Sequence, residues 1–77
     1  MKLKLNDYEV ADIIKIMREW TNKYQTDFAK SIGYTEDSIS KMENGKRNVY
    51  LHTFIKMAKA NGINIYIEKS GSIKNEM

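Results

Sequence analysis

Side chains that can donate or accept hydrogen bonds gather between Tyr24 and Arg47. One short stretch holds carboxylates, hydroxyls and an ammonium group at a spacing that suits a single helix and its start: Thr35, Glu36, Asp37, Ser40 and Lys41. Carboxylates accept from amino groups, an ammonium donates to oxygen and ring-nitrogen acceptors, and hydroxyls do either. Such a mixture fits the recognition of a molecular edge that presents donors and acceptors side by side.

Catalysis and metal binding find little support in the same sequence. Glu36 and Asp37 adjoin, so their carboxylates do not converge across a cleft as a paired acid and base would. The chain has no cysteine and a single histidine, His52, which cannot form a zinc site alone. There is no glycine loop of the phosphate-cradling kind and no nucleophile triad. We therefore expect neither an enzyme nor a cofactor.

The composition narrows the class of protein. The 77 residues have room for one compact domain, expected at 1–69, with a flexible tail at 70–77. No apolar stretch approaches the ~20 residues that span a bilayer, and the N-terminus lacks the apolar region of a signal peptide. The net charge of +3 permits binding to nucleic acid without arguing for it. A cytoplasmic protein without membrane contact is expected.

The first predicted helix covers residues 7–21. Asn6 and Glu9 form a capping pattern at its start. One apolar stripe follows at helical spacing: Val10, Ile13, Ile14, Met17 and either Trp20 or Thr21. Ahead of this helix, alternating lysine and leucine at residues 2–5 predict a short edge strand.

Two short helices are predicted next, at 25–32 and 35–43. Gly33 suits the end of the first, because glycine adopts left-handed backbone geometry at little steric cost. Thr35 can cap the second helix, and the Asn44-Gly45 pair ends it.

A fourth helix at 51–61 and a strand at 63–68 complete the predicted elements. The helix carries an apolar stripe: Leu51, Phe54, Ile55, Met57 and Ala58. The strand places Ile63, Ile65 and Ile67 on one face. A lone strand is unstable, so it must pair with residues 2–5, with the same strand of a second chain, or with both. Pairing between chains would make the three isoleucines a dimer interface.

The two short helices and their turn form a helix-turn-helix candidate. Ala29 is small where the two helices approach, and Ile39 anchors the second helix so that its opposite face projects outward. A helix is slim enough to enter the major groove of DNA, where base edges present distinguishable patterns. The polar side chains of residues 35–41 would then face the bases.

Two half-motifs resemble the lambda Cro and C1-type repressor family, also called the XRE family. Residues 25–33, QTDFAKSIG, are similar to the family's Q-x-x-L-A-x-x-x-G, and residues 38–48, SISKMENGKRN, are similar to the family's stretch that contains I-S-x-x-E-N-G-K-R. With the final core helix, the resemblance covers about residues 8–62. It implies a mainly α fold, a compact four-to-five-helix repressor-like DNA-binding domain, to which we add the strands at 63–68 and 2–5.

The resemblance also implies a function and a set of roles. The protein would bind double-stranded DNA sequence-specifically as a transcriptional regulator, acting as a repressor and a homodimer on a pseudo-palindromic operator. Bases would be read by Thr35, Glu36, Asp37, Ser40 and Lys41. The DNA backbone would be held by Gln25, Tyr34, Ser38, Asn44, Lys46 and Arg47. Arg18 and Glu43 match a family ion pair that ties the first helix to the end of the reading helix. Small phage and mobile-element regulators commonly look like this.

Three departures from the family pattern affect what the chain would recognise. Tyr24 stands where Ser or Thr is usual, and Val49 and Tyr50 replace a common Pro-Ser pair. Glu36 and Asp37 are acidic where polar or basic residues are common. A carboxylate near phosphates is repelled unless it accepts from a base, so cytosine N4 is its expected partner, with adenine N6 as the less common one.

Two readings of the acidic residues remain open. Glu36 and Asp37 equally suit the first turn of any helix, where they favour its dipole. In a second hypothesis the same fold is a protein-binding module whose acidic helix engages a protein partner, such as a toxin. An antitoxin-type regulator would do both jobs.

Overall fold

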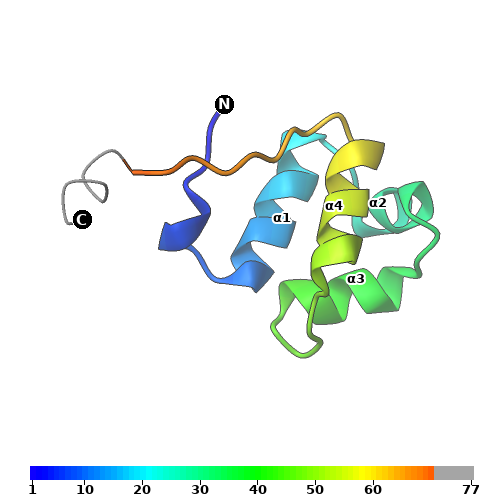
Figure 1. The fold of residues 1–77 in the computed structure, drawn as a ribbon. Helices are drawn as coiled ribbons and strands as arrows, with labels where there is room; N and C mark the ends of the chain where they lie inside the picture. Colours follow the sequence, from blue (N-terminus) through cyan, green and yellow to red (C-terminus); the bar gives the residue numbers. More distant parts are fainter. Residues whose placement is uncertain (71–77) are drawn as a thin grey trace.

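The computed structural model describes residues 1–70. A 3-10 turn at Leu5–Asp7 precedes four helices: α1 (Val10–Trp20), α2 (Gln25–Ser31), α3 (Glu36–Glu43) and α4 (Leu51–Ala60). In Figure 1, α4 stands beside α1, and α3 lies across the lower part of the molecule. The mainly helical fold is confirmed. The predicted tail, beyond Ser70, lies outside the described residues. None of the helices in that range is long and apolar enough to cross a membrane.

Three of the helices begin and end within one residue of their predicted limits, but α1 does not. Its N-cap residue is Glu9 rather than Asn6, and no side chain caps it. Asn6 instead lies inside the 3-10 turn, where the backbone N–H of Asp7 donates to Lys4 at 3.1 Å. Val10 consequently stands at the tip of α1, 51% exposed rather than in the core.

No strand forms anywhere in residues 1–70, so both predicted strands are wrong as features of a single chain. Residues 2–4 have no regular structure, and residues 63–69 leave α4 as an irregular segment that Figure 1 shows running past the N-terminus. A strand is defined by the neighbouring strand that pairs with its N–H and C=O groups. Alternating side chains do not supply that neighbour.

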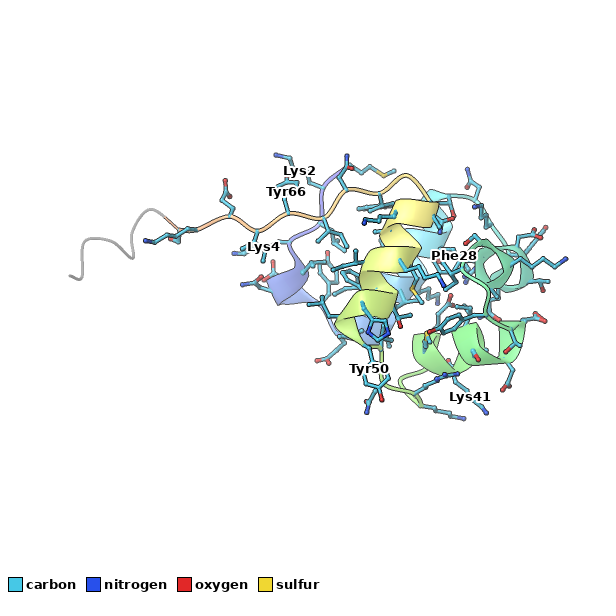
Figure 2. All side chains as sticks on the ribbon, turned by 45° about the vertical axis from the view of Figure 1, so that its right-hand side comes forward. Lys2, Lys4, Phe28, Lys41, Tyr50 and Tyr66 are labelled. Carbon is cyan, nitrogen blue, oxygen red and sulfur yellow. The ribbon has the colours of Figure 1, made fainter. Side chains whose placement is uncertain are left out.

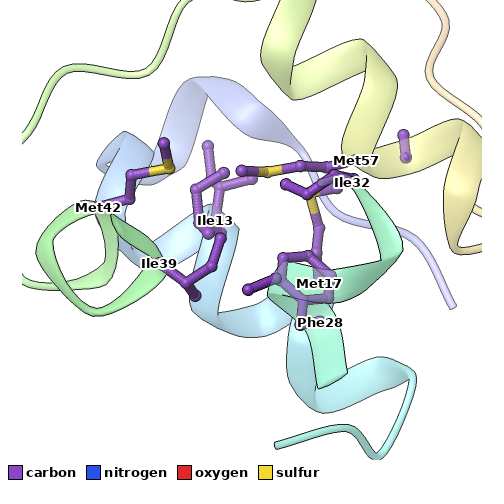
Figure 3. Packing of buried hydrophobic residues seen from close by; sticks show 10 residues of the cluster. Ile13, Met17, Phe28, Ile32, Ile39, Met42 and Met57 are labelled. Atoms are coloured by element: carbon purple, nitrogen blue, oxygen red, sulfur yellow. The ribbon is translucent and has the colours of Figure 1, made fainter. Parts of the chain in front are cut away.

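The core is a single cluster of buried side chains from all four helices (Figure 3). Its members are Ile13, Ile14, Met17, Phe28, Ala29, Ile32, Ile39, Met42, Met57 and Ala58. Ile39 and Met42 point from α3 into this cluster, and both are almost fully buried. Burial of one face of α3 fixes the opposite face toward solvent.

The buried face of α4 differs from the predicted stripe. Leu51 is 71% exposed and Ile55 38%, whereas Thr53, which is not in the stripe, is buried. Met57 and Ala58 are buried as predicted. The Thr53 hydroxyl lies 3.1 Å from the Tyr34 hydroxyl, so it can be buried without losing a hydrogen bond. Hydrophobic spacing does not reveal such a pairing between elements. Leu51 and Ile55 therefore form an exposed apolar edge on α4.

Candidate nucleic-acid interface

The turn between α2 and α3 sets the angle at which α3 is presented. Gly33 has a φ of 76°, a left-handed conformation that glycine adopts readily. The turn is closed by a hydrogen bond of 2.8 Å from the Tyr34 N–H to the Ala29 carbonyl. Ala29 is 1% exposed, as expected where two helices approach. This tight connection aims the start of α3 outward.

The start of α3 is capped as predicted. Thr35 is its N-cap residue, and the threonine hydroxyl accepts from the backbone N–H of Ser38 at 3.2 Å. Glu36 and Asp37 occupy the first turn and are exposed. Helix α2, by contrast, begins at Tyr24, which is 80% exposed and makes no side-chain cap.

The outer face of α3 carries an ion pair between two of the residues expected to read bases. Lys41 Nζ lies 3.0 Å from Asp37 Oδ2, and their side chains are 54% and 75% exposed. Figure 2 shows Lys41 at the edge of the molecule beside α3. Ser40, on the same helix, is half-buried and accepts a long 3.5 Å hydrogen bond from Asn44. The outer face of α3 is therefore polar and open to solvent.

Three of the residues expected to hold the DNA backbone form one cluster. Arg47 Nη1 donates to the Ser38 hydroxyl at 2.7 Å, and its guanidinium lies 5.8 Å from the centroid of the Tyr34 ring. A cation over an aromatic ring at this distance is attracted by the ring's negative face. The loop after α3 thus returns to the beginning of the same helix, which the sequence did not indicate. We call Tyr34, Ser38 and Arg47 the basic cluster.

The end of α3 is held by a buried ion pair with α1. Arg18 Nε donates to Glu43 Oε2 at 2.7 Å, and Arg18 Nη2 donates to Glu43 Oε1 at 3.0 Å. The two side chains are only 16% and 4% exposed. The hydrogen bond from Arg18 to Glu43 is the main cause that raises the pKa of Arg18, so the guanidinium stays charged at any working pH. α1 and α3 are thereby clamped together.

Gln25 joins this pair, which the sequence did not reveal. Its Nε2 donates to Glu43 Oε1 at 3.2 Å, so the first residue of α2 is tied to the last residue of α3. A carboxamide nitrogen carries two hydrogens, and one remains for an outside acceptor such as a phosphate oxygen.

The loop after α3 exposes the remaining two residues expected at the backbone. Asn44 is the C-cap residue of α3, and Gly45 follows it with a φ of 73°. The Lys46 N–H then donates to the Lys41 carbonyl at 2.8 Å, which closes the helix end. Asn44 and Lys46 are both exposed.

The three isoleucines predicted to form a dimer interface have different surroundings. Ile63 is half-buried and packs against the core of its own chain. Ile65 is 37% exposed and Ile67 98% exposed. Only the outer part of the segment 63–69 is therefore available to a second chain.

Comparison with known proteins gives one family and several similar structures. A family model described as helix-turn-helix, HTH_3, matches residues 14–67. A structure of a HipA–HipB–O2–O3 complex is similar with a TM-score of 0.67 at 24% identity, covering 91% of this chain and 99% of the other. A HipB–O1–O2 complex gives 0.66 at 27% identity, covering 88% and 100%. A HipB–O4 20mer complex gives 0.64 at 26% identity, covering 91% and 97%. No curated protein sequence matches significantly.

Proposed function

Because the chain belongs to the helix-turn-helix family of Cro and C1 type, we propose that it is a cytoplasmic transcriptional regulator that binds double-stranded DNA sequence-specifically, as a repressor. The observation that carries the proposal is the outward face of α3, polar and exposed, with the basic cluster at its side. HipB, which shares this fold, has been solved in complexes with O1, O2 and O4.

In the proposed complex, α3 enters the major groove. Its outer side chains contact base edges: Thr35, Glu36, Asp37, Ser40 and Lys41. The flanking groups bind phosphates and fix the register without reading sequence: Gln25, Ser38, Asn44, Lys46 and Arg47. Tyr34 contributes through its ring, which holds Arg47, because its hydroxyl faces Thr53. Arg47 is already held over Tyr34 by the contacts described above, so it loses little conformational freedom when it meets a phosphate.

Arg47→Ala tests the phosphate-binding role of the basic cluster. Each phosphate neutralised by a cation adds about −0.9 to the slope of log K against log salt on duplex DNA. We expect Arg47→Ala to weaken binding to every duplex by a similar factor and to reduce that slope by about 1. Fluorescence anisotropy between ~50 and ~200 mM salt measures both quantities. Lys59→Ala, an exposed lysine at the end of α4, is the matched control and should change neither.

We further propose that the regulator is a homodimer whose segments 63–69 pair with each other. Ile65 and Ile67 expose apolar surface that residues 1–70 leave uncovered. Pairing of two such segments would supply the backbone hydrogen bonds between strands that each segment lacks alone. It would also bury Ile65 and Ile67. Two α3 helices related by a two-fold axis would then meet a pseudo-palindromic operator.

Ile67→Lys tests the dimer. The side chain is 98% exposed in one chain, so the substitution should leave the subunit folded but disrupt the apolar contact between subunits. Light scattering is expected to report a dimer for the unsubstituted chain and a monomer for Ile67→Lys. Asn64→Lys adds the same charge on the other face of the segment and should remain dimeric. A monomer in all three cases would contradict the proposed dimer.

A second candidate function is binding to a protein partner, as an antitoxin-type regulator. HipB has been solved with HipA, and in this chain Leu51 and Ile55 leave an apolar edge exposed on α4. A stoichiometric protein complex in the absence of any salt-sensitive DNA affinity would favour this function over the first.

A further inference from the structure

The exposed charges of α3 are unusual for a helix that approaches phosphates. Glu36, Asp37 and Lys41 are exposed, whereas Glu43 is buried against Arg18. The outer face therefore offers two carboxylates and one ammonium group. Only the ammonium group is attracted to the DNA backbone, and the two carboxylates are repelled by it.

The one cation on this face is already engaged. Lys41 Nζ lies 3.0 Å from Asp37 Oδ2, one helical turn away. An acid placed four residues before a base is the favoured order on a helix, and Asp37 in the first turn also favours the helix dipole. Both side chains are more than half exposed, so solvent weakens the pair without abolishing it, and a DNA contact that satisfies both side chains can open it.

When this ion pair opens, its two side chains can contact either a phosphate or a base pair. The two contacts differ in which side chain they satisfy. A phosphate gives Lys41 an acceptor but gives Asp37 only repulsion. A cytosine–guanine pair gives Asp37 the cytosine N4 donor and gives Lys41 the guanine O6 and N7 acceptors. Only the base pair replaces the partner that each side chain gives up.

We propose that Asp37 determines specificity by keeping the Lys41 ammonium group ion-paired against non-cognate DNA and freeing it where a base pair satisfies both side chains. The proposal rests on the proposed function, in which α3 enters the major groove. Asp37 thus contributes by weakening wrong complexes as well as by contacting the right base. Figure 2 shows Lys41 beside α3 on the face concerned.

The test compares two carboxylates on the same helix. Asp37→Asn removes the partner of Lys41, whereas Glu36→Gln removes one equal charge from a residue that forms no ion pair within residues 1–70. On a mixed-sequence, non-cognate duplex at ~50 mM salt, we expect Asp37→Asn to tighten binding about 3- to 10-fold and to steepen the salt slope by about 1. Glu36→Gln should tighten it by less and leave the slope unchanged.

The decisive comparison introduces Asp37→Asn into a chain that already carries Lys41→Met. With Lys41 absent, Asp37→Asn has no ammonium to release, so its effect on the non-cognate duplex should fall to that of Glu36→Gln. On a duplex selected by the unsubstituted protein, Asp37→Asn should lower the ratio of cognate to non-cognate affinity about tenfold. Melting temperatures close to that of the unsubstituted chain establish that the variants are folded.

The outcomes separate this inference from the proposed function. If the unsubstituted protein binds a selected duplex but Asp37→Asn and Glu36→Gln behave alike, the inference is wrong and the proposed function stands. If the unsubstituted protein binds no duplex at all, the proposed function is wrong and the inference falls with it.

Discussion

Arg18→Ala is expected to lower the free energy of unfolding by about 3 kcal/mol. The Glu43 side chain is 4% exposed, and Arg18 gives it two hydrogen bonds, at 2.7 and 3.0 Å. Without Arg18, the carboxylate stays buried, and within residues 1–70 its one remaining side-chain hydrogen bond is the 3.2 Å bond from Gln25. An uncompensated buried charge destabilises the folded protein far more than the loss of an exposed ion pair does. In a domain of this size, such a loss takes a large part of the total stability.

Two comparisons make the result on Arg18 interpretable. Asp37→Asn breaks the exposed pair with Lys41 and should change the free energy of unfolding by no more than about 0.5 kcal/mol. Arg18→Met combined with Glu43→Leu removes both buried charges and should recover most of the loss. Urea denaturation followed by circular dichroism measures all three variants. A cost for Arg18→Ala no greater than that for Asp37→Asn would show that the ion pair does not hold α1 to α3.

Ile39→Ala is expected to cost about 3 kcal/mol as well, for a different reason. Ile39 is 0% exposed and anchors α3 from beneath (Figure 3). Truncation removes apolar burial and leaves a cavity that the surrounding side chains fill only in part. The same change loosens the attachment of the proposed reading helix, so DNA affinity should fall even where the variant remains folded.

The size of the truncated group should set the effect at Ile39. Ile39→Val removes one methylene from the same place and should cost about 1 kcal/mol. Ile67→Ala removes the same groups as Ile39→Ala from a side chain that is 98% exposed, so the stability of the subunit should hardly change. Thermal or chemical unfolding of the three variants gives the order. Equal costs for Ile39→Ala and Ile67→Ala would contradict the placement of Ile39 in the core.

The helices could be predicted because their signals are local. Gly33 and Gly45 follow α2 and α3 with positive φ, and the Thr35 hydroxyl caps α3. Such turns and caps depend on residue types within a few positions of each other. The spacing of apolar residues located the buried face of α3, with Ile39 and Met42 inward.

The errors occurred where a residue's surroundings depend on a distant partner. Thr53 is buried with its hydroxyl 3.1 Å from the Tyr34 hydroxyl, whereas Leu51 and Ile55 of the same helix are exposed. The predicted strand at 63–68 pairs with no other segment of residues 1–70. Helical and strand periodicity is a property of one segment. It therefore predicts neither the contact between Thr53 and Tyr34 nor whether the segment 63–68 has a strand to pair with.

In the proposed interface, too, the sequence predicted the individual residues but not the contacts between them. The sequence singled out Tyr34, Ser38 and Arg47 separately, but only the structure brings them into one cluster. The bond from Gln25 to Glu43 likewise joins the ends of two helices. Both arrangements arise from the angle between α2 and α3, which is a property of the whole core.

Selection of bound sequences from a random duplex library tests the central proposal most directly. We expect one enriched, pseudo-palindromic sequence whose half-site centres lie about 34 Å apart, close to one turn of DNA, with a cytosine–guanine pair in each half-site. The Asp37→Asn protein, selected in parallel, should return a less uniform set at that pair. A pool that stays as random as the input after repeated rounds with the unsubstituted protein would contradict sequence-specific binding by α3.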